Sequence, residues 1–125
     1  MTLLFDENFP PYLPEALRLF GYDAKHVLDD HSKGIEDTAL FAEIGLNGWT
    51  WISHDKGIRR KPHERRAMQD AGIGAFIITG RSHRSARQMM IFIMQHIEEL
   101  LRLDENTTRP FVIGLSDRGK FEVLK

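Results

Sequence analysis

Three acidic side chains stand where metal-ion chemistry would need them. Asp6 follows the apolar run 2–5, Asp55 follows the run 50–53, and Asp37 lies in the first turn of an apolar helical pattern over 35–46. Taken singly, each acid also suits a turn or a helix cap. Together they would suit Mg²⁺ or Mn²⁺, which take oxygen ligands and keep several waters. Such an ion polarises a phosphate and activates a water, so the acids indicate phosphodiester hydrolysis.

A dense basic segment begins directly after Asp55. Residues 54–87 hold nine Lys and Arg against three acids, although the net charge of the whole chain is only -1. Basic clusters bind phosphate backbones through charge and counterion release. We therefore expect nucleic-acid contacts from this segment and from the loop after Asp6, at Asn8, Lys56, Arg59, Arg60, Lys61, Arg65 and Arg66. A solvated charged helix face is the alternative interpretation of the segment.

Strands and helices must alternate to bring these residues together. The patterns predict strands over 2–5, 23–27, 50–53 and 75–79, and helices over 13–20, 35–46, 62–71 and 85–103. Such alternation predicts an α/β fold with a mostly parallel sheet covered on both faces. Residues 111–115 and 121–124 flank a turn and predict a C-terminal hairpin. Ligands of such sheets bind beyond the carboxyl ends of the strands, where Asp6 and Asp55 fall.

Other conspicuous side chains favour packing over chemistry. We place Trp49 and Trp51 on opposite faces of the strand 50–53 and expect both to pack in the core. The six histidines lack zinc-motif spacing, and His54 alone is a candidate for a phosphate contact beside a structural role. The apolar stretch 89–94 is wider than one helical stripe, which predicts deep burial or a dimer or partner interface.

Length and composition narrow the class of protein. A chain of 125 residues with 42% hydrophobic content suits a single domain over 1–125. Its apolar runs are shorter than the ~18 residues of a membrane span. The chain has no cysteine, which excludes disulfides and thiolate metal sites. We expect a cytoplasmic protein without a membrane segment.

Three short motifs carry a family resemblance. They are LLFDEN at 3–8 followed by Pro10, IED at 35–37 and ISHDK at 52–56. In order and spacing they resemble the PIN-like domains of small bacterial VapC-type toxins, over roughly residues 2–80. The resemblance implies a three-layer α/β/α PIN-like fold, Mg²⁺- or Mn²⁺-dependent ribonuclease activity on RNA, and an antitoxin protein as partner. It also implies catalytic and metal-binding roles for Asp6, Asp37 (or Glu36) and Asp55.

Two alternatives compete with the nuclease interpretation. A receiver-like phosphoacceptor domain would use Asp6 with Glu7, a phosphorylated Asp55 and a switch hydroxyl at Thr79. Against it, no lysine stands near the predicted fifth strand to hold a phosphoryl group. The second alternative is a non-catalytic RNA- or antitoxin-binding module with a degenerate site, because the fourth acid of many PIN domains has no clear match here. Metal-dependent cleavage of RNA would separate this module from a nuclease.

Overall fold

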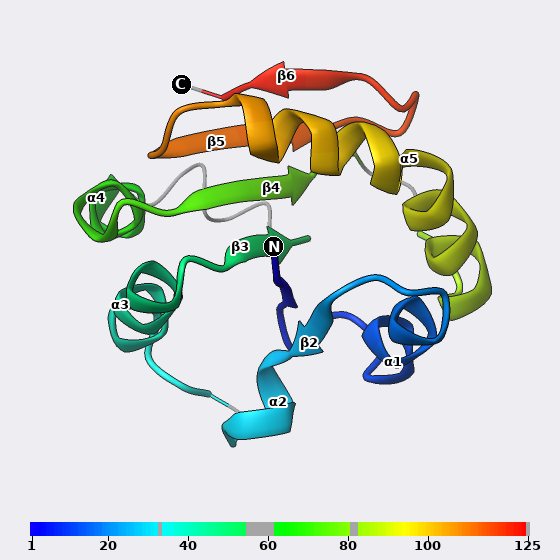
Figure 1. The fold of residues 1–125 in the computed structure, drawn as a ribbon, viewed down its shortest axis with the longest axis horizontal. Helices are drawn as coiled ribbons and strands as arrows, with labels where there is room; N and C mark the ends of the chain where they lie inside the picture. Colours follow the sequence, from blue (N-terminus) through cyan, green and yellow to red (C-terminus); the bar gives the residue numbers. More distant parts are fainter. Residues whose placement is uncertain (33, 55–61, 81–82, 125) are drawn as a thin grey trace.

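The structure, a computed structural model, describes residues 1–32, 34–54, 62–80 and 83–124. Within these residues six strands form one sheet in the order β2-β1-β3-β4-β5-β6 (Figure 1). The strands are β1 (Leu3–Phe5), β2 (Ala24–His26), β3 (Thr50–Ser53), β4 (Gly74–Ile78), β5 (Phe111–Leu115) and β6 (Phe121–Val123). The helices are α1 (Tyr12–Leu19), α2 (Val27–Asp30), α3 (Asp37–Asn47), α4 (Pro62–Ala71) and α5 (Ala86–Asn106). The predicted α/β class is confirmed.

The order of the strands reverses at one place in the sheet. β1 pairs in parallel with β2 on one side and with β3 on the other, and β4 and β5 continue the parallel sheet beyond β3. Only the last pair, β5 with β6, is antiparallel, as the predicted hairpin requires. The strand that follows β1 in sequence, β2, lies on one side of β1, and the next strand, β3, lies on its other side. In open α/β sheets, a ligand crevice forms at such a switch point, beyond the carboxyl ends of the strands.

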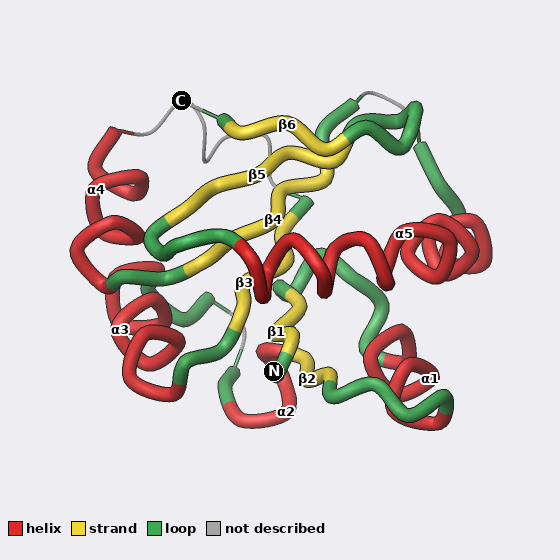
Figure 2. The backbone as a smooth tube through the Cα atoms, turned by 45° about the horizontal axis from the view of Figure 1, so that its top comes forward, coloured by secondary structure: helices red, strands yellow, loops and turns green. Residues whose placement is uncertain are grey.

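The core lies in two layers, one on each face of the sheet. Helices α1 and α5 pack on the face that carries Phe5, Ile52 and Phe76, whereas α3 and α4 pack on the face that carries Trp51 and Ile77. Neighbouring positions on a strand fall into different layers because successive side chains point to opposite faces. Figure 2 shows α5 running across the strands as the long cover of one face. The three-layer arrangement agrees with the predicted fold.

A short helix occupies part of the segment between the predicted strand 23–27 and the predicted helix 35–46. Helix α2 starts directly after β2, and two side chains cap its first turn. Nδ1 of His26 accepts a 3.1 Å hydrogen bond from the backbone N–H of Leu28, and Oδ2 of Asp29 accepts one of 2.9 Å from the N–H of His26. These bonds supply partners that a first helical turn lacks. The sequence pattern did not predict this helix, because four residues are too few to show an apolar helical repeat.

Two expectations about apolar side chains have different outcomes. The prediction of opposite faces for Trp49 and Trp51 is wrong: both pack against the cluster beneath α3 and α4, because positions two apart on a strand share a face. The stretch 89–94 is largely core, with Met89, Phe92 and Ile93 buried against the sheet, while Ile91 is 47% exposed. Among the described helices, α5 included, none combines the length and apolar character that crossing a membrane requires.

Candidate metal centre

Asp6 stands at the switch point between β1 and β3. Its backbone N–H continues the pairing of these strands with a 3.1 Å bond to the Ile52 carbonyl, and the residue is only 5% exposed. Oδ1 accepts a 2.9 Å bond from the Asn8 N–H, and Oδ2 accepts bonds of 2.6 Å from the Ser53 hydroxyl and 3.3 Å from the His54 N–H. Hydrogen bonds to an ionised carboxylate are strong. They fix the Asp6 carboxylate at the carboxyl ends of the central strands.

A buried histidine holds the loop that follows Asp6. Nε2 of His26 lies 2.8 Å from the Phe9 carbonyl, and the His26 ring is fully buried. Because Nδ1 already accepts from Leu28, the proton must sit on Nε2, which donates to Phe9. The Phe9 N–H in turn donates to the Asp6 carbonyl at 3.2 Å. The His26 ring therefore ties β2 to the turn that carries Asp6 and Asn8.

A small hollow opens beside Asp6 on the side of the sheet that α3 covers, and its volume is about 80 Å³. Its lining comes from β3, α2, α3, the loop after β1 and the loop before α3: Asp6, Glu7, Asn8, Val27, Ile35, Asp37, Leu40, Trp51 and Ser53. Asp37 is the first residue of α3 and is exposed. The structure thus brings Asp37 and Asn8 to the same hollow as Asp6. None of the described lining residues is basic, so the hollow is anionic.

The chemistry of this hollow fits a hard divalent cation. Carboxylate and amide oxygens are ligands that Mg²⁺ prefers, usually one or two carboxylates with retained waters. The volume of about 80 Å³ exceeds the roughly 10–15 Å³ of such space that one ordered water needs, so coordinated waters would fit beside an ion. In the part of the chain that the structure describes, no three His, Asp or Glu side chains are placed to hold one ion together. The third predicted ligand, Asp55, lies outside the described residues, so the convergence of Asp6, Asp37 and Asp55 stays a prediction.

The predicted nucleic-acid contacts fall only partly on described residues. Lys56, Arg59, Arg60 and Lys61 lie outside them. Arg65 is half-buried, and its Nη2 donates a 3.2 Å bond to the carbonyl of Leu124, just after β6. Arg66, on the same helix, is exposed. Arg65 therefore joins α4 to the end of the hairpin, and its predicted contact with phosphate stays a prediction, as does that of Arg66.

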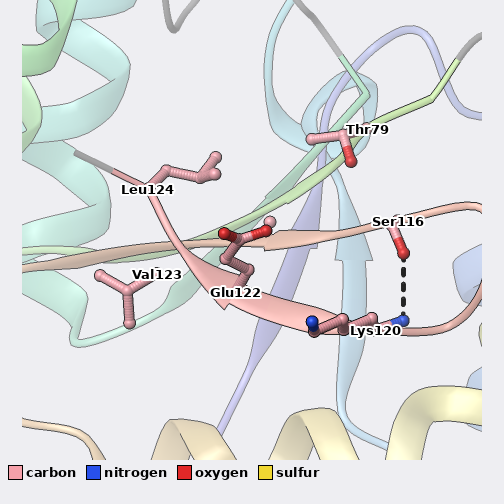
Figure 3. A pocket seen from close by; sticks show the side chains of 7 residues that line it. Thr79, Ser116, Lys120, Glu122, Val123 and Leu124 are labelled. Carbon is pink, nitrogen blue, oxygen red and sulfur yellow. Dashed lines mark hydrogen bonds between the residues drawn. The ribbon is translucent and has the colours of Figure 1, made fainter.

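A second, larger hollow lies near the carboxyl ends of β4 and β5. Its volume is about 370 Å³, and Thr79, Ser116, Lys120 and Glu122 are among its lining residues (Figure 3). The Ser116 hydroxyl accepts a 3.2 Å bond from the backbone N–H of Lys120, which closes the hairpin turn. None of the described residues predicted for catalysis, metal binding or nucleic-acid contact lines this hollow.

Three residues of the acidic hollow were missed by sequence reasoning about catalysis. Glu7 and Ser53 both line it, and Ser53 also bonds to Asp6. Two sequence features could have indicated them: Glu7 directly follows Asp6, and Ser53 places a hydroxyl at the end of a strand. Trp51 lines the hollow as well, since it shares a strand face with Ser53, although the sequence marked it only as a packing residue.

A family comparison covers the part of the chain that builds this hollow. A family model described as a PIN like domain matches residues 1–80, which include Asp6, Asp37 and Ser53. The chain therefore belongs to the PIN-like domain family. PIN-like domains are generally nucleases, which implies nucleic acid as the class of substrate. Neither the curated proteins nor the solved structures yield a significant match. The family match therefore favours the PIN-like interpretation over the receiver-like phosphoacceptor domain.

Proposed function

We propose that this protein is an endoribonuclease that depends on Mg²⁺ or Mn²⁺ and acts as the toxin of a bacterial toxin-antitoxin pair. One observation carries the proposal: the hydrogen-bonded carboxylate of Asp6 stands at the switch point of the sheet and shares an anionic hollow with Asp37. Asp55 completes the proposed ligand set. The toxin role and the antitoxin partner are supported by the resemblance of the three acid-bearing motifs to VapC-type toxins.

The side chains of the hollow would have different roles in such a reaction. A bound divalent ion would supply the positive charge that polarises the scissile phosphate and lowers the pKa of a coordinated water. Asp6 would hold the ion without rearranging, because Ser53 and the backbone N–H of Asn8 already fix its carboxylate. Asp37 would approach from the solvent side of the hollow. Ser53 is fully buried, so it is unsuited to attack RNA, and water is the proposed nucleophile.

The distribution of charge supports a metal-assisted reaction on a polyanion. Glu7 joins Asp6 and Asp37 in the hollow, and three carboxylates would repel an RNA phosphate that approached alone. A divalent cation would cancel much of this repulsion. The basic residues 56–66 follow Asp55 directly in the sequence and would hold the phosphates on either side of the cleaved bond.

The chemistry is tested by incubating purified protein with a labelled mixed RNA pool. We expect fragments with MgCl2 or MnCl2, none with excess EDTA, and recovery when the ion is restored. Glu105→Gln changes an exposed acid near the end of α5, away from the hollow, and should cleave like the parent. RNA that stays intact with both ions, yet shifts on a native gel, would instead support the non-catalytic binding module.

The toxin role needs a separate test in cells. Induced expression of the chain alone in a bacterium should arrest growth, and Asp37→Asn should relieve the arrest at equal protein level. Asp37 is exposed at the start of a helix, so this substitution should leave folding intact. Normal growth with the parent protein, combined with cleavage in vitro, would leave a nuclease that is not a toxin.

A further inference from the structure

One residue that lines the acidic hollow carries a buried hydrogen-bond donor without an acceptor among the described residues. Trp51, on β3, lines the hollow with Asp6 and Asp37 and is only 4% exposed. Within the described residues, its indole Nε1 is buried and makes no hydrogen bond. Leaving a buried donor unsatisfied costs about 1–3 kcal/mol. An apolar side chain of similar shape at position 51 would avoid this cost. The unsatisfied indole N–H therefore favours a role beyond packing.

Core packing explains the Trp51 ring but not its N–H group. The ring meets Phe41 of α3 edge-on, with centroids 6.0 Å apart and planes inclined by 76°. This contact is apolar, and phenylalanine at position 51 would keep most of it. An N–H group directed at an aromatic face gains only a weak, second-order interaction. The packing role predicted from the sequence is therefore incomplete.

The surroundings indicate what kind of acceptor would suit this donor. The charged side chains that share the hollow with Trp51 are carboxylates, so a cation and its waters are the favoured occupants. A water between a carboxylate and Trp51 would donate to the first and accept from the second. An indole offers a donor without positive charge, whereas Lys or Arg at this position would compete with the cation. The hollow also has room for waters beside an ion.

We propose that Trp51 is a positioning residue whose indole N–H donates to an oxygen atom that enters the hollow with the metal ion. This oxygen is either a water on the ion or a non-bridging oxygen of a phosphate group. The inference rests on the proposed function, because it requires an ion between Asp6 and Asp37. It assigns to Trp51 the task of orienting that oxygen toward the acids.

The direct test observes the indole N–H by nuclear magnetic resonance. In Trp49→Phe protein labelled with ¹⁵N, Trp51 is the only tryptophan, because the chain has two. Trp49 is half-buried and does not line the hollow, so this variant should fold. We expect MgCl2 to move the indole N–H signal downfield and to slow its exchange with solvent. Asp6→Asn in the same background should remove the response.

Two arms of this titration identify the source of the oxygen. A response to MgCl2 alone assigns a metal-bound water, and a response only after inorganic phosphate is added assigns a phosphate oxygen. An unchanged signal in both arms, while Mg²⁺ binding that depends on Asp6 is measured by calorimetry, overturns the role of Trp51 and leaves the metal centre intact. Absence of any Mg²⁺ binding contradicts the proposed function itself, and the role of Trp51 with it.

A substitution provides the second measurement. Trp51→Phe should bind Mn²⁺, or phosphate in the presence of Mn²⁺, about 3- to 10-fold more weakly than Trp49→Phe, which is the matched control. Without metal, losing an unsatisfied donor should offset part of the packing lost with the larger ring. Affinities equal to those of Trp49→Phe for both ligands would overturn the inference. If Trp51→Phe does not fold, the indole signal of the Trp49→Phe protein still decides.

Discussion

The hydroxyl of Ser53 donates a 2.6 Å hydrogen bond to Oδ2 of Asp6, and this bond joins the carboxyl ends of β3 and β1. Both residues are buried, so solvent competes little for the bond. The two strands also pair through their backbones up to the Asp6 N–H. As a result, the carboxylate of Asp6 is held by the end of β3 as well as by the loop that follows β1, which is the preorganisation that a metal ligand needs.

Replacing Ser53 tests whether this bond matters to the metal centre. Ser53→Ala should lower the free energy of unfolding by about 1–2 kcal/mol, because a buried acceptor loses a donor. It should also weaken Mn²⁺ binding, since the Asp6 carboxylate becomes less constrained. Urea unfolding and Mn²⁺ titration by electron paramagnetic resonance measure the two effects. Ser116→Ala, at the end of β5, is the control with parental affinity, and equal affinity in Ser53→Ala would refute the positioning role.

The two neighbouring arginines of α4 should respond differently to truncation. Arg65→Ala removes the bond to the Leu124 carbonyl and should lower stability by about 0.5–1.5 kcal/mol. Arg66→Ala changes an exposed residue and should instead weaken RNA binding and reduce its salt dependence, with little change in sequence preference. Filter binding at several salt concentrations compares the two. An unaltered salt slope in Arg66→Ala, also when combined with Arg59→Ala and Arg60→Ala, would make the segment a solvated surface.

A buried polar network at the other end of β3 should affect stability without affecting the site. The Thr50 hydroxyl donates to Asp104 at 2.9 Å, and Nη2 of Arg109 donates to Asp104 at 2.9 Å and to Thr50 at 2.6 Å. Thr50→Val keeps the shape but removes the hydroxyl, which should cost about 1–3 kcal/mol of unfolding free energy. Metal-dependent cleavage at a temperature where the variant is folded should equal that of the parent. Reduced cleavage there would mean that the network acts on the hollow.

Local patterns were sufficient to predict the strands and the end of the sheet that carries the acids. The runs ending at Phe5 and Ser53 are short, fully buried strands, and acids or polar residues follow each of them. Such runs specify strands because both faces of a parallel sheet are covered. The position of Asp37 in the first turn of a helix followed from a local signal, because carboxylates are favoured there. That Asp37 and Asp6 line one hollow comes from the structure, and their joint binding of a metal ion stays a prediction.

Contacts between distant segments could not be read from such patterns. The bond from Arg65 to Leu124 requires that β6 dock beside α4, and the contacts of Arg109 with Thr50 span nearly half the chain. The unsatisfied donor of Trp51 is likewise a property of the packed core, since a sequence shows a tryptophan but not the partners of its nitrogen. Three-dimensional packing decides these features, and they changed the interpretation of Arg65 and Trp51 most.

Substitution of Asp6 tests whether RNA cleavage depends on a metal ion held by this carboxylate. Asp6→Asn keeps the shape of the side chain but removes its negative charge, and it places an amide that must orient its N–H₂ among donors from Ser53, Asn8 and His54. We therefore expect some loss of stability, about 1–3 kcal/mol, and folding must be checked by circular dichroism. The exposed Asp37→Asn provides a second variant that should fold like the parent.

The deciding measurement is the rate of Mn²⁺-dependent RNA cleavage by folded Asp6→Asn, compared with the parent at the same protein and ion concentrations. Loss of a metal ligand removes several kcal/mol of transition-state stabilisation. We expect a rate at least about 100-fold lower than that of the parent, with Asp37→Asn also impaired. Cleavage by Asp6→Asn at the parental rate, and persisting in EDTA, would contradict the metal-dependent mechanism.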